Sequence, residues 1–153
     1  MSRIALFVAT AGYAGFAPIA PGTAGSVVGL ALYVMLRWID HAAVETSALV
    51  ASLVFGMWAA GVVEKELGKD PGPVVIDEVH GMLVTVAFLD VTPVGAFLAF
   101  ILFRIYDVIK PYPAGRLEHI HGGPGIMLDD LMAGVYSHLT MRLLIAVFPG
   151  VFA

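Results

Sequence analysis

The longest stretches of this chain contain no charged side chain, and this limits the folds open to it. Residues 4–36 and 46–63 have no Asp, Glu, Lys or Arg. A segment that is apolar on every side belongs either to a buried helix or to a membrane. The second stretch has 18 residues, which is near the lower limit for a helix that spans a bilayer. Runs this rich in Ala, Leu and Met favour helix over strand.

The composition excludes several classes of protein. Of the 153 residues, 59% are hydrophobic and 13% are charged, against roughly 25% charged in a typical globular chain. This hydrophobicity excludes a disordered chain, and the net charge of −4 argues against a nucleic-acid partner. Because the chain has no cysteine, thiolate metal sites and cysteine nucleophiles are excluded. We therefore expect a single all-α domain over residues 1–153, a compact and very apolar helical bundle that is membrane-embedded or membrane-associated.

Glycine and proline divide the chain into its expected helices. We expect helices over residues 23–38, 46–63, 74–90 and 93–109, and a last helix from about Asp129 into the apolar C-terminus. A short strand at residues 74–76 is an alternative at that position. Residues 68–73 and 111–125 are expected to be loops. The bundle could span the bilayer or dip into one leaflet, and both arrangements stay open.

The first polar segment is Ala20-Pro-Gly-Thr-Ala-Gly-Ser26. Its glycines flank two hydroxyl groups just before an expected helix, so free backbone N–H groups and the helix dipole could hold an anion. The alternative is a Pro/Gly turn in which Thr23 or Ser26 caps the helix.

The second polar segment contains the consecutive acids Asp77 and Glu78 in apolar surroundings. Ionised carboxylates there are costly unless a cation or hydrogen bonds compensate them. Magnesium prefers oxygen ligands and is a natural partner. On a helix Gly81 lies on the same face as Asp77, and we expect it to leave space for a ligand. The alternative is an acidic helix N-terminus without a ligand.

The third polar segment, residues 104–130, holds three of the eight basic residues and four of the twelve acids. Arg104, Asp107 and Lys110 recur every three residues, so a helix would carry them as a stripe. Two cations around a carboxylate suit a phosphate beside a metal ion, although the same spacing also fits a ladder of intrahelical salt bridges. Asp129 and Asp130 add a second acid pair.

Four blocks hold most of these polar residues: Ala20-Pro-Gly-Thr-Ala-Gly-Ser26, Ile76-Asp-Glu-Val-His-Gly81, Phe103-Arg-Ile-Tyr-Asp-Val-Ile-Lys-Pro-Tyr-Pro113 and Gly122-Gly-Pro-Gly-Ile-Met-Leu-Asp-Asp-Leu-Met-Ala-Gly134. They resemble the sequence blocks of the phosphatidylglycerophosphatase A family, in the family's order and over about residues 12–140. The resemblance implies a Mg²⁺-dependent lipid phosphatase of phospholipid biosynthesis, which hydrolyses phosphatidylglycerophosphate to phosphatidylglycerol and phosphate. It also implies a compact all-helical bundle at the bacterial cytoplasmic (inner) membrane, with the active site facing the cytoplasm.

The resemblance and the chemistry of these residues together give each a role. We expect the acids to hold one or two Mg²⁺ ions, and these acids are Asp77, Glu78, Asp107, Asp129 and Asp130. Among them Asp77, Asp107 and Asp130 are the expected catalytic residues. The expected ligands of the substrate phosphate are Arg104, Lys110, Gly22, Thr23 and Ser26. A water made more acidic by the cation is the expected nucleophile, with a carboxylate taking its proton, and a covalent phospho-aspartate is the alternative.

Two readings without catalysis remain at this point. One is a membrane protein that binds a phospholipid headgroup or an ion without turnover. The other is a small transporter or channel subunit whose intramembrane acids line a path. The acids here lie at segment ends and in loops, which favours the phosphatase. The oligomeric state is not indicated by the sequence.

Overall fold

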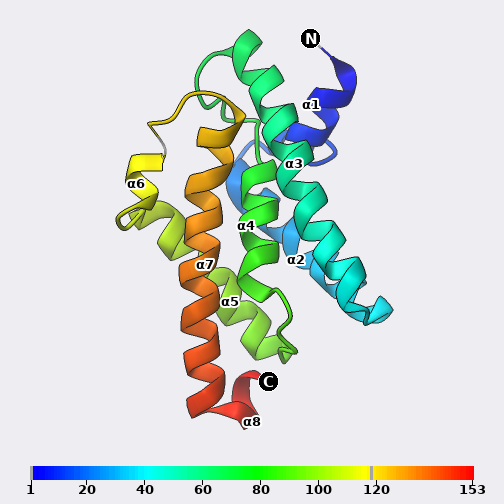
Figure 1. Ribbon diagram of the computed structural model, residues 1–153, viewed down its shortest axis with the longest axis vertical. Helices are drawn as coiled ribbons and strands as arrows, with labels where there is room; N and C mark the ends of the chain where they lie inside the picture. Colours follow the sequence, from blue (N-terminus) through cyan, green and yellow to red (C-terminus); the bar gives the residue numbers. More distant parts are fainter. Residues whose placement is uncertain (1, 118) are drawn as a thin grey trace.

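The structure is a computed structural model that describes residues 2–117 and 119–153, and these residues form an all-helical fold without strands (Figure 1). The expected all-α class is confirmed. Glu118 lies outside the described residues. The elements are α1 (Arg3–Ala9), the 3₁₀ helix η1 (Ala14–Phe16), α2 (Pro21–Ile39), α3 (Ala42–Leu67), α4 (Ile76–Val86), α5 (Pro93–Ile109), α6 (Ala114–Leu117), α7 (Gly123–Val147) and α8 (Pro149–Phe152).

Helix α4 is the centre of the fold. In Figure 1 it lies between α7 and α3, and it packs against α2, α3, α5 and α7. Nine of its eleven residues are buried, among them the apolar Val79, Met82 and Val86. A short helix this apolar is stable because its neighbours cover nearly all of its surface.

Close packing around α4 depends on glycine. A Cβ at Gly81 would lie 2.5 Å from the Phe103 ring and 2.8 Å from the backbone oxygen of Asp130. Gly81 therefore lets α5 and α7 approach α4 directly. The expectation that Gly81 leaves space for a ligand is wrong, because protein atoms fill that space.

The structure differs from the sequence-based expectation at several bounds: α3 begins at Ala42, α4 ends at Val86, and the helix α6 lies within the expected loop 111–125. The expected alternative of a strand at residues 74–76 is wrong, since Ile76 begins α4. The last helix begins at Gly123 and not near Asp129. Pro124 is compatible with this earlier start because the first turn of a helix needs no N–H at that position. Asp129 and Asp130 consequently lie inside α7.

Helices α2 and α3 are long and apolar enough to cross a membrane, by length and composition alone. Little of them is buried: the share is 28% for the most apolar window of α2 and 22% for that of α3. Large apolar side chains are exposed along them, for example Trp38 at 85%. The apolar surface of the protein is therefore turned outward as well as into the core.

Candidate functional site

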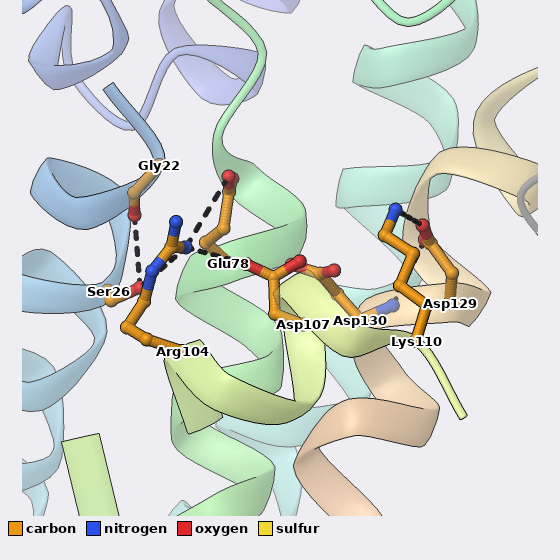
Figure 2. Close-up of polar contacts among 8 residues, drawn as sticks. All are labelled: Gly22, Ser26, Glu78, Arg104, Asp107, Lys110, Asp129 and Asp130. Atoms are coloured by element: carbon orange, nitrogen blue, oxygen red, sulfur yellow. Dashed lines mark hydrogen bonds and ion pairs between the residues drawn. The ribbon is translucent and has the colours of Figure 1, made fainter. Parts of the chain in front are cut away.

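Ends of five helices line a single cavity of about 180 Å³. The N-terminal ends of α2, α4 and α7 meet there with the C-terminal ends of α3 and α5. The three N-terminal ends carry partial positive charge, which favours anions. In Figure 2 Arg104 lies on one side of a group of carboxylates, and Lys110 with Asp129 lies on the other.

The middle of the site holds three acids, Asp77, Glu78 and Asp130, which we call the central carboxylates. One carboxylate oxygen from each lies within 4.8 Å of those of the other two. Asp77 Oδ1, Glu78 Oε2 and Asp130 Oδ2 are buried and have no hydrogen-bond partner in the described part of the chain. Buried polar atoms are normally paired, so three unpaired carboxylate oxygens at one point require an explanation.

The ionisation of the central carboxylates reflects this crowding. Burial raises the pKa of the Asp77 carboxyl well above its usual range, and the charges of Glu78 and Asp130 raise it further. Burial likewise raises the pKa of Asp130 well above its usual range, with contributions from Asp107 and Glu78. A divalent cation bound here would counteract both shifts, because its positive charge would offset the cost of burial and the repulsion between the acids, and carboxylate oxygens are ligands that it prefers. The all-oxygen donor set fits Mg²⁺.

Arg104 is held by contacts with three elements. Its Nη1 lies 2.7 Å from Asp107 Oδ2, 3.9 Å from Glu78 Oε1 and 3.5 Å from the Ser26 hydroxyl, to which it donates. The Asp107 contact lies within α5, as the sequence spacing predicts, whereas the other two reach α4 and α2. The guanidinium is therefore fixed beside the central carboxylates, and its side chain remains 24% exposed.

Lys110 forms the second cation–acid pair of the site. Its Nζ lies 2.6 Å from Asp129 Oδ2. Asp129 also accepts the backbone N–H of Asp130 at 3.0 Å through Oδ1. Burial raises the pKa of Asp129, and the hydrogen bond from Lys110 acts in the opposite direction. The pair joins α7 to the end of α5 at the rim of the cavity.

The first polar segment, residues 20–26 at the start of α2, contributes backbone and a buried hydroxyl to the site instead of charged side chains. Pro21 and Gly22 line the cavity, and a Cβ on Gly22 would run into the Glu78 carboxylate. The Thr23 amide donates to the Ala20 carbonyl at 2.9 Å, within the first turn. The Ser26 hydroxyl is fully buried and donates to the Gly22 carbonyl at 3.0 Å. Direct contact of Thr23 and Ser26 with a phosphate stays a prediction.

Three polar residues that the sequence did not single out also line the cavity: Glu64, Lys69 and Asp70. Glu64 belongs to α3, and Lys69 and Asp70 lie in the loop that follows it. Their sequence signal was weak, because they mark only the end of an apolar stretch and a Gly/Pro loop. Their position follows from α3, which brings its C-terminal end beside the start of α4.

His80 lies next to the site but is engaged elsewhere. Its Nδ1 is 2.8 Å from the Ser52 hydroxyl of α3, and burial lowers its pKa to about 4. The ring is therefore neutral at ordinary pH and links α4 to α3.

A family model described as Phosphatidylglycerophosphatase A matches residues 7–145. A protein of Escherichia coli K12 named "Phosphatidylglycerophosphatase A" is 32% identical over 126 residues, which cover 80% of this chain and 73% of the relative. One of Haemophilus influenzae with the same name is 32% identical over 77% of this chain and 74% of the relative. A Bacteroides thetaiotaomicron protein named "Putative phosphatidylinositol-3-phosphatase" is 40% identical over 90% of this chain and 91% of the relative. No solved structure matches the chain significantly.

Proposed function

The chain belongs to the phosphatidylglycerophosphatase A family, and on that premise we propose that it hydrolyses phosphatidylglycerophosphate to phosphatidylglycerol and phosphate. Membership makes it a phosphoric monoester hydrolase. The observation that carries the proposal is the group of unpaired carboxylate oxygens that lies between two cationic side chains, Arg104 and the cavity-lining Lys110. A phosphate monoester beside a divalent cation needs both kinds of group.

We propose Mg²⁺ as the cofactor. The central carboxylates would hold it, with Asp107 and Asp129 as further ligands, directly or through water. When bound, Mg²⁺ supplies positive charge that neutralises these acids and polarises the phosphate oxygens. The unpaired buried oxygens support this proposal, because they have no hydrogen-bond partner among the described residues and Arg104 is the cation that contacts Glu78, at 3.9 Å.

The cationic residues bind and orient the substrate in this proposal. Arg104 offers a planar fork suited to two phosphate oxygens, and its contacts with Asp107 and Ser26 fix the direction of that fork. Lys110 approaches from the opposite rim as a point charge. The N-terminus of α2 at Gly22 completes the positive surroundings.

The chemical step needs a group that accepts a proton from the attacking water. Asp107 is our candidate, since it lines the cavity and lies between Arg104 and Asp130 in Figure 2. In this position Asp107 Oδ2 would pair with Arg104, and the other carboxylate oxygen would take the proton.

The membrane is the proposed location. The apolar and largely exposed α2 and α3 support insertion, since the core helix of a soluble protein would be mostly buried. The related proteins named above are bacterial. We propose the inner membrane, with the cavity facing the cytoplasm.

A second candidate substrate is a phosphatidylinositol phosphate, which the name of the Bacteroides relative favours. Purified protein should be offered phosphatidylglycerophosphate, phosphatidylinositol 3-phosphate and soluble phosphomonoesters, with Mg²⁺ present. We expect the highest kcat/KM for phosphatidylglycerophosphate. A preference for the inositol lipid would replace the proposed substrate, and binding of either lipid without phosphate release would support a non-catalytic headgroup-binding protein.

A further inference from the structure

An apolar groove runs between α2 and α5 and begins beside the candidate site. Its walls include Val27, Leu30 and Tyr33 from α2 and Ala96, Phe97 and Phe100 from α5. Val27 directly follows Ser26, and Phe100 lies one helical turn before Arg104. The groove therefore starts where Arg104 and Ser26 meet.

The size and direction of the groove are set by the two helices. Seven residues separate Ser26 from Tyr33 and also Arg104 from Phe97, which corresponds to about 10 Å along each helix. The groove has a volume of about 520 Å³, within the range of pockets for small ligands. Ala96 contributes to this space because its side chain is only a methyl group.

The groove offers a ligand almost no polar atom. Among the wall residues that the structure describes, Tyr33 alone has a polar side chain; it is 5% exposed and has its hydroxyl engaged. That hydroxyl donates to the Leu89 carbonyl at 2.8 Å and accepts the Val91 N–H at 3.3 Å. The ring, and not the hydroxyl, is left to contact a ligand.

The groove is open toward the outside of the fold. Val27 is 53% exposed and Phe97 is 67% exposed. Helix α2, which forms one wall, is also one of the two candidate membrane spans. A hydrocarbon chain could therefore enter sideways from a bilayer without crossing a polar surface.

We propose that this groove holds one acyl chain of the phospholipid substrate while the headgroup reaches the cavity past Arg104. This inference rests on the proposed function. A phospholipid has the same two-part chemistry as the surface, with an anionic group at one end and hydrocarbon beyond it. Inside a bilayer lipid tails are as apolar as the groove, so the groove orients the substrate more than it tightens binding.

The chain-length dependence of monomeric substrates tests this proposal. For short-chain phosphatidylglycerophosphates below their micelle concentration, we expect kcat/KM to rise roughly fourfold for each methylene group that leaves water for the groove. The rise should level off once the chain exceeds the length of the groove. Ala96→Trp fills the groove and should lower the ratio of kcat/KM for the longer chains to kcat/KM for the shorter ones by at least about tenfold.

Val94→Trp is the matched control, because Val94 lies on the same helix, is 57% exposed and is not part of the groove wall. It should keep the chain-length dependence of the wild type. If Ala96→Trp keeps it too, or if both variants lose it equally, the groove does not bind the acyl chain. If Ala96→Trp changes the oligomeric state instead, the groove is a contact between copies of the chain and the proposal is wrong.

Photolabelling separates this inference from the proposed function, because it does not require turnover. A phosphatidylglycerophosphate with a diazirine in one acyl chain should label peptides from α2 and α5, and unlabelled lipid should compete. Labelling of α2 and α5 without phosphate release would contradict the proposed function but support acyl-chain binding in the groove. Phosphate release with competed labels only on α3 or α7 would keep the function and overturn the groove.

Discussion

Replacing Asp77 by asparagine should stabilise the metal-free protein while removing its activity. Asp77 belongs to the three central carboxylates, whose oxygens lie within 4.8 Å of one another. Two unit charges 4.8 Å apart repel each other by about 3.5 kcal/mol at an effective dielectric constant of about 20. The neutral amide of the substituted side chain would have no such repulsion with its two neighbours, and it could donate to one of the unpaired oxygens.

The stability that Asp77→Asn gains has an upper limit, because the metal-free wild type can relieve the repulsion by binding a proton. Protonating a carboxyl of ordinary pKa 3.8 at pH 7 costs about 4 kcal/mol. We expect the substitution to raise the free energy of unfolding by about half of this, roughly 2 kcal/mol, which is roughly 4–8 °C in Tm for a chain of this size. Because the pKa of Asp77 is raised in the folded chain, its carboxyl lowers stability as pH rises above the ordinary carboxyl range. The difference from the wild type should therefore be largest at neutral pH and disappear below about pH 4.

The assay is thermal unfolding in detergent with EDTA, followed by phosphate release with Mg²⁺. Activity should fall by roughly 10²–10³-fold or more. Asp90→Asn is the matched control, since Asp90 is 87% exposed and pairs with Arg37 at 3.3 Å on the surface. Asp90→Asn should leave both the unfolding temperature and the phosphate-release activity close to those of the wild type. An Asp77→Asn variant that is less stable than the wild type in EDTA, or that keeps near-normal turnover, would refute the reasoning.

Three further predictions concern the same cavity. Gly22→Ala should lower activity at least roughly a hundredfold, because the added methyl displaces the Glu78 carboxylate and crowds Arg104 Nη1 at 3.1 Å; Gly150→Ala, with open space around it, should not. Arg104→Lys should lower kcat/KM by roughly 10²–10³-fold while CD spectra stay unchanged, because lysine lacks the planar fork; equal kcat/KM would show that Arg104 does not bind the phosphate. The Mg²⁺ concentration for half-maximal activity should fall as the pH rises from about 6 to about 8, because the raised pKa values of the central carboxylates make protons compete with the cation; a pH-independent value would place the cation elsewhere.

The helices could be predicted where local signals mark both ends. Helix α5 has the expected bounds because Pro93 begins it and Lys110, followed by Pro111, ends it. The start of α7 was missed because Gly-Gly-Pro-Gly reads as a loop, although proline is well tolerated in a first helical turn. The space expected above Gly81 was wrong for a different reason: only the tertiary structure shows that Phe103 occupies it.

The candidate site could be predicted in its acids and cations but not in all its contacts. Ionisable groups in an apolar chain are conspicuous, and the structure brings those of α4, α5 and α7 together. Ser26 is buried and donates to the Gly22 carbonyl, as a serine inside a helix often does with the carbonyl four residues earlier. Its contact with Arg104 depends on the packing of α2 against α5, which the motif does not specify. Glu64 and Lys69 depend on how α3 packs against the fold, and the sequence does not encode that in a local pattern.

The most direct test of the central claim is phosphate release from phosphatidylglycerophosphate by the purified full chain in detergent. The rate should be measured with Mg²⁺, after EDTA, and after Mg²⁺ is restored, for the wild type and for Asp130→Asn. If the central carboxylates hold the catalytic cation, EDTA stops the wild type, Mg²⁺ restores it, and Asp130→Asn stays inactive throughout. Phosphate release that continues in EDTA, or near-normal turnover by Asp130→Asn, would contradict the account.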